Sequence, residues 1–125
     1  MHRIAAILIG LIAALHFYIA WFEMFAWATR GPQVFSSFPV ELFEPTKVLA
    51  ANQGLYNSFL AIGLTWSLFI RDPQWRFNVA ACFLLFVVAA GIFGALTASP
   101  RIFFVQTVPA VIALLFAYLA YRKAV

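Results

Sequence analysis

The residues in this chain best suited to chemistry are a few polar side chains set inside long apolar runs. They are His16, Glu23, Asn52, Gln53, Asn57 and Gln106. Such side chains are costly to place in lipid, so they need a partner or a function there. In a binding site the carboxylate would carry a charge, the imidazole would take or give a proton, and the amides would orient a ligand. The pattern predicts a polar pocket that binds or translocates a small amphipathic molecule or ion.

The spacing of these residues indicates which of them share a helix face. His16 and Glu23 are seven positions apart, which leaves them within about 20° of each other on an α-helix. Gln53 and Asn57 are four apart and also share a face, while Asn52 lies on the adjoining one. Three amides within six residues offer more donors and acceptors than one helix contact uses. Their density favours a polar cavity over ordinary contacts between helices.

Glu23 also has a simpler interpretation, as one half of an ion pair at a helix end with Lys47 or Arg30. Paired-histidine metal motifs and glycine-rich phosphate loops do not occur in the sequence. One carboxylate, one histidine and several amides can still move protons on a lipid. A membrane enzyme acting on a lipid or quinone-like substrate is therefore an alternative to a binding protein. An accessory subunit of a membrane complex is another.

His16 has a structural alternative as well, because an imidazole in mid-span needs hydrogen-bond partners, for which Asn57 or Tyr56 are candidates. As the one histidine inside an apolar run, it leaves no second histidine for axial haem ligation within the chain. The lone Cys82 provides neither a disulfide nor a cysteine metal cluster. The sequence thus predicts no metal and identifies no cofactor.

Four apolar runs must position these side chains. They cover residues 4–27, 46–70, 77–98 and 102–121, each near the roughly 20 residues needed to cross a bilayer as a helix. Residues 28–45 hold Gly31, Pro32, Pro39 and Pro45, and are expected to form an outer loop. The prediction is an all-α integral membrane protein, an up-down four-helix bundle forming one transmembrane domain over 1–125. In it Glu23, Gln53 and Gln106 would converge in the outer half.

Composition and charge support a membrane protein. The chain is 66% hydrophobic and 10% charged, whereas roughly a quarter of the residues in soluble domains are charged. Five basic residues fall on one side of the predicted topology and three on the other: Arg3, Arg71, Arg76, Arg122 and Lys123 against Arg30, Lys47 and Arg101. The positive-inside rule then places both termini in the cytoplasm of a multi-pass protein in the inner (plasma) membrane. No basic face indicates a nucleic-acid partner.

Small residues recur at helical spacing in two of the runs, at Gly54, Ser58, Ala61 and Thr65, and at Ala90, Gly94 and Ala98. Such stripes let membrane helices approach closely, within one chain or between copies. They favour packing inside the monomer, and leave a homo-oligomer or another membrane partner as an alternative.

Four stretches resemble one known family. They are Glu23–Trp27, Thr46–Asn57 with its asparagine-glutamine-glycine block, Ala90–Thr97 and Gln106–Ala110. Together they are similar to the domain of unknown function family 1304, a group of small four-helix membrane proteins. The resemblance implies an integral membrane protein, and it implies no particular activity.

Overall fold

The protein is all-α. The computed structural model describes residues 2–125, and every regular element in that range is helical. The elements in chain order are α1 (His2–Trp21), the π-helix η1 (Phe22–Ala26), α2 (Trp27–Val34), the short 3₁₀-helix η2 (Val40–Leu42), α3 (Phe43–Phe69), α4 (Pro73–Thr97), the π-helix η3 (Phe103–Thr107) and α5 (Val108–Arg122). The fold therefore consists of four long helical stretches, as predicted, with two of them interrupted by π-helical turns.

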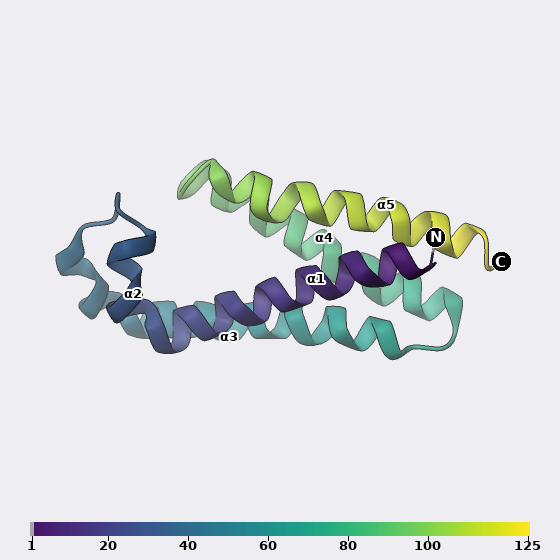
Figure 1. Ribbon diagram of the computed structural model, residues 1–125, viewed down its shortest axis with the longest axis horizontal. Coiled ribbons are helices and arrows are strands. Elements are labelled where there is room, and N and C mark those ends of the chain that lie inside the picture. The colour runs from purple at the N-terminus through teal and green to yellow at the C-terminus, as the bar shows by residue number, and fades with distance from the viewer. Residues whose placement is uncertain (1) are drawn as a thin grey trace. The chain divides into compact units, whose positions relative to one another are not determined.

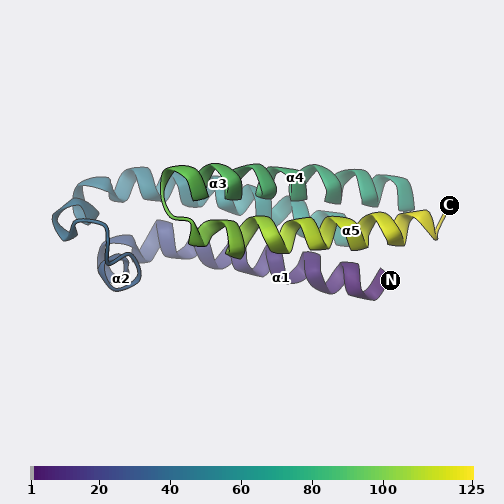
Figure 2. The same cartoon turned by 90° about the horizontal axis from the view of Figure 1, so that it is seen from above.

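Residues 2–14 and 60–125 form one compact unit, called unit 1 here. It contains the first half of α1, the end of α3, and the whole of α4 and α5, which run in alternating directions (Figures 1 and 2). All four segments contribute to its core, which includes Ile9, Leu64, Leu84, Val87 and Ala113. Ala110, Ala113 and Ala117 of α5 belong to the same core cluster, and small residues of this kind let helices pack closely.

The turn between α3 and α4 is built from the Arg71-Asp72-Pro73 sequence, as predicted. The Asp72 carboxylate accepts a hydrogen bond from the Trp75 backbone N–H at 2.8 Å and caps α4. Pro73 occupies the first turn, where its missing N–H is not needed. Since cap and proline together fix the start of the helix, α4 begins at Pro73, four residues before the predicted start.

Residues 15–59 form unit 2. Here the chain leaves α1 through η1, and α2 then runs across the end of α1 instead of extending it (Figures 1 and 2). A π-helical turn and a proline are both established causes of helix bending, and Pro32 lies inside α2. After α2, residues 35–39 and η2 lead into α3.

An aromatic cluster holds this part of unit 2 together, and consists of Phe22, Trp27, Phe35, Phe38 and Phe43. The Trp27 ring lies 5.1 Å from that of Phe43 and 5.7 Å from that of Phe35, measured between centroids. The structure thus corrects the expected outer loop 28–45, because residues 28–34 and 40–45 are helical. Ring packing gives this polar, proline-containing segment a core of its own.

Three of the four helical stretches are long and apolar enough to cross a membrane: His2–Val34, Pro73–Thr97 and Phe103–Arg122. The predicted fourth span, α3, has 27 residues but is not among them. Its first half carries Asn52, Gln53 and Asn57, which lower its apolar content. The polar residues that indicate a site are thus the ones that weaken the hydropathy signal of the helix bearing them.

Candidate functional site

The carboxylate of Glu23 lies in η1, where the helix widens by one residue. Glu23 is half-buried, and the two residues flanking η1, Trp21 and Trp27, keep right-handed helical geometry. Ala26 ends the π turn with φ −123° and ψ 4°, outside the helical region. One additional residue rotates the side chains that follow it by about 100° relative to a regular α-helix. π-Helical turns of this kind occur frequently at functional sites.

Asn57 of α3 is the hydrogen-bond partner of Glu23. Its side-chain nitrogen donates to Glu23 Oε2 at 2.8 Å and also approaches the carbonyl oxygen of Gln53 at 3.2 Å. The pairing requires two helix backbones to come close, and Gly54 allows this. A Cβ atom at Gly54 would lie 2.9 Å from the Ala20 carbonyl oxygen and 2.6 Å from Met24 Cγ. The missing side chain therefore lets the short Asn57 side chain reach the carboxylate.

The basic residues considered as partners for Glu23 are used elsewhere. Lys47 forms an ion pair with Glu44, three positions earlier on α3. The Arg30 guanidinium lies 5.6 Å from the centroid of the Trp21 ring, which is a cation–π contact. Glu23 is therefore held by an amide, and the ion pair at a helix end is not formed.

A hollow of about 340 Å³ lies beside Glu23, between the η1–α2 segment and the first turns of α3. Its wall is largely apolar, with Met24, Phe25 and Val48, while Glu23 and Lys47 bring charge to it. Lys47 forms its ion pair with Glu44. The Glu23 carboxylate therefore lines this hollow as a hydrogen-bond acceptor that has no cationic partner among the lining residues.

The other predicted site residues lie in different surroundings. His16 is completely buried on α1, while Asn52 and Gln53 are exposed. Neither these three nor Asn57 line the hollow, so among the six predicted residues Glu23 alone does. The structure thus joins Glu23 with Asn57 and places His16 in a packed interior.

Gln106 belongs to unit 1 and lies, half-buried, in η3. There η3 packs closely on α4 at Gly91, since a Cβ atom at that glycine would lie 2.9 Å from the Thr107 backbone nitrogen and 3.1 Å from Gln106 Cβ. Thr107 is buried, and its hydroxyl donates to the Val88 carbonyl oxygen at 3.3 Å. The convergence of Gln106 with Glu23 and Gln53 stays a prediction.

Sequence reasoning missed the two π-helical turns and the contact between Trp27 and Thr46. The Trp27 indole N–H donates to Thr46 Oγ1 at 3.0 Å, and this hydroxyl in turn donates to the Leu42 carbonyl oxygen at 2.6 Å. Glu23 and Gln106 each lie in a π turn, which regular 3.6-residue spacing does not anticipate. In the sequence, the one feature that the two π-helical turns share is a polar residue, Glu23 or Gln106, inside an otherwise apolar helix.

Comparison with known proteins adds family membership to this geometry. A family model described as "Protein of unknown function (DUF1304)" matches residues 10–118, which include Glu23, Asn57 and Gln106. The protein named "Uncharacterized protein YpaA" from Lactococcus lactis subsp. lactis (strain IL1403) is 29% identical over 115 residues, covering 90% of this chain and 95% of the relative. No solved structure matches the chain. With its match extending over nearly all of the described helices, the chain belongs to the DUF1304 family.

Proposed function

We propose that this protein is a multi-pass protein of the inner (plasma) membrane that binds or translocates a small amphipathic molecule or ion at Glu23. The observation that carries the proposal is the Glu23–Asn57 hydrogen bond, formed by a half-buried carboxylate inside a long apolar helical stretch. Acidic residues at such positions are rare in membrane proteins, and they commonly mark ligand or ion pathways.

The chemistry of the hollow indicates the kind of ligand. Asn57 binds one oxygen of the carboxylate, Oε2, and fixes its orientation. An ionised carboxylate has acceptor sites on both oxygens, so it can also receive a cation or a hydrogen-bond donor. Phe25 and Val48 provide apolar surface beside it. These groups suit a molecule with a cationic or donor group attached to an apolar body.

The membrane setting of the proposal follows from the helices. Three of them have the length and apolarity to cross a bilayer, and we propose that α3 crosses as the fourth, with both termini in the cytoplasm. The bilayer is then the first partner of the chain. A second copy or a membrane complex could cover its exposed apolar side chains, but the site at Glu23 requires neither of them.

The test is the binding of a lipophilic cation, tetraphenylphosphonium, to the purified full chain in lipid nanodiscs. We expect Glu23→Gln to weaken binding at least tenfold, because it removes the negative charge and keeps the size of the side chain. Asn57→Leu should weaken it less, since the carboxylate remains but is no longer oriented. Isothermal titration calorimetry gives the Kd of each variant.

Glu41→Gln is the matched control, because it removes the same charge from an exposed position in η2 of the same unit. It should leave the Kd unchanged. Equal affinities for Glu23→Gln and the parent would contradict the proposal, as would an equal loss in Glu41→Gln. Thermal unfolding of each variant in the same nanodiscs checks that the fold is retained.

A further inference from the structure

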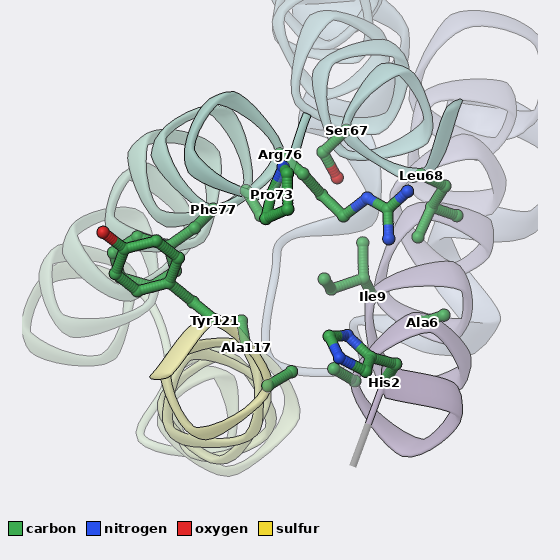
Figure 3. A pocket seen from close by; sticks show the side chains of 13 residues that line it. His2, Ala6, Ile9, Ser67, Leu68, Pro73, Arg76, Phe77, Ala117 and Tyr121 are labelled. Carbon is green, nitrogen blue, oxygen red and sulfur yellow. The ribbon is translucent and has the colours of Figure 1, made fainter. Parts of the chain in front are cut away.

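A second cavity, of about 90 Å³, lies entirely within unit 1 (Figure 3). It is partly open and is lined by the start of α1, the end of α3, the first turns of α4 and the last turns of α5. Most of its wall is apolar and includes Ile9, Leu68, Phe77 and Ala117. Its polar groups come from His2, Ser67, Arg76 and Tyr121.

Arg76 is the charged group of this cavity. It is half-buried, and its Nε donates to the carbonyl oxygen of Ile70 at 2.7 Å. That bond anchors the base of the guanidinium, while its outer end extends into the space between α3 and α1 (Figure 3). Within residues 2–125 the one ion pair is Lys47 with Glu44, so no described carboxylate neutralises Arg76. No acidic residue lines the cavity either.

The other polar groups differ in how far they are already used. Ser67 donates to the Leu64 carbonyl oxygen at 2.6 Å, and the Tyr121 hydroxyl donates to the side-chain oxygen of Gln74. The imidazole of His2 lies on the opposite side of the cavity from Arg76, on the first turn of α1 (Figure 3). The groups that remain to bind a ligand are therefore the guanidinium N–H donors of Arg76 and the ring nitrogens of His2.

Charge at this end of unit 1 favours an anion. Besides Arg76, the basic residues Arg3, Arg71, Arg122 and Lys123 belong to the chain ends and to the α3–α4 turn, which lie together (Figures 1 and 2). Asp72 is the one acidic residue among these segments, and it caps α4. An excess of one sign of charge around a cavity with apolar walls concentrates ions of the opposite sign.

We propose that this cavity binds the anionic head group of an amphiphile, a carboxylate or a phosphate, through Arg76 and His2. Guanidinium groups bind both of these anions with paired N–H donors. A cavity of about 90 Å³ holds a few water molecules, which suits the anionic group of an amphiphile rather than a whole lipid. In this proposal the acyl chain leaves past Leu68 and Ala6, the half-buried and exposed apolar residues of the wall. Basic pockets between helices bind lipid head groups by the same chemistry.

The first test compares three probes on the full chain purified in uncharged detergent: oleate, a phosphatidylglycerol and a phosphatidylcholine. We expect an anionic probe to bind at least tenfold more tightly than phosphatidylcholine, with affinity that falls as salt is added. Tighter binding of oleate identifies a carboxylate ligand, and tighter binding of phosphatidylglycerol identifies a phosphate. Equal affinity for all three probes overturns the proposal.

The second test uses variants with the probe that binds best. Arg76→Gln should weaken binding at least tenfold, while Arg101→Gln should not, because it removes the same charge from an exposed residue outside the cavity. An equal loss in both variants, or in neither, overturns the proposal. Ala6→Leu leaves every charge in place and narrows the cavity from an exposed position, so it decides the case if Arg76→Gln does not fold. Unchanged binding in Ala6→Leu contradicts a bound head group.

Discussion

At the scale of single residues, the Glu23–Asn57 hydrogen bond depends on a close approach of two helices at Gly54. The sequence left Glu23 either as a site carboxylate or as an ion-pair partner of Lys47 or Arg30, and in the structure Asn57 binds it. Depth and face could be estimated from helical geometry, whereas the partner depends on how closely two backbones approach. Gly54 sets that approach, because a Cβ atom there would lie 2.9 Å from a carbonyl oxygen of α1. The stripe of small residues that includes Gly54 predicted a close helix contact on this face of α3. It did not predict which helix would make that contact.

A glycine outside the predicted stripes gives the sharpest prediction at this scale. A Cβ atom at Gly91 would overlap the Thr107 side chain and lie 2.9 Å from the Thr107 backbone nitrogen, which cannot move away without displacing η3. Gly91→Ala should therefore lower the free energy of unfolding by about 1–3 kcal/mol, as overpacking typically does. Thermal unfolding in detergent measures the change.

Gly10→Ala is the control for that measurement. The nearest atom to a Cβ at Gly10 is Leu68 Cδ1, at 4.0 Å, which is ordinary contact. Since alanine is favoured over glycine inside a helix, stability should stay the same or rise by roughly 0.5–1 kcal/mol. A Gly91→Ala variant as stable as Gly10→Ala would mean that α4 and η3 are not closely packed.

At the scale of elements, hydropathy and turn residues located most helix ends within a few positions. The predicted run 102–121 became η3 and α5, which end at Arg122, and 46–70 became α3. The failure lies between Trp27 and Phe43, where polar residues and prolines indicated a loop and the chain forms α2 and η2. Local propensity favoured a loop, but tertiary packing of five aromatic rings outweighed it. The phenylalanines and Trp27 were visible in the sequence. That Trp27 contacts all four phenylalanine rings could not be predicted from it.

The hydrogen bond from Trp27 should add to the stability of this aromatic cluster. Trp27→Phe keeps a ring in the cluster and removes the indole donor to Thr46, so we expect a loss of about 0.5–1.5 kcal/mol. Trp27→Ala removes the ring as well and should cost about 3–5 kcal/mol. Thermal unfolding in detergent ranks the variants. Trp66→Phe, at an exposed position of α3, should match the parent. Equal losses at Trp27 and Trp66 would show that the cluster is not a core.

At the scale of the whole molecule, the number of membrane crossings is the central question. Three crossings, by α1, α4 and α5, would leave the start of α1 and the end of α5 on opposite sides of a membrane. Within unit 1, however, these two ends lie together (Figure 1). For a protein that spans a membrane this arrangement favours an even number of crossings, and we propose that α3 provides the fourth. Ala61, Leu64 and Ser67 of α3 are fully buried, as expected of a helix inside a bundle.

Accessibility of single cysteines tests this topology directly. With Cys82 replaced by alanine, Ser36→Cys between α2 and η2 and Ser99→Cys between α4 and η3 should react with a membrane-impermeant maleimide added to intact cells. Gln74→Cys, at the start of α4, and Ala124→Cys should react only after the cells are opened, because the positive-inside rule predicts that the basic residues near them place this end in the cytoplasm. If α3 does not cross, positions 36 and 74 lie on the same side and become labelled together. Labelling of positions 74 and 124 in intact cells, without labelling of position 36, would instead mean a reversed orientation with four crossings, so the two parts of the prediction fail separately.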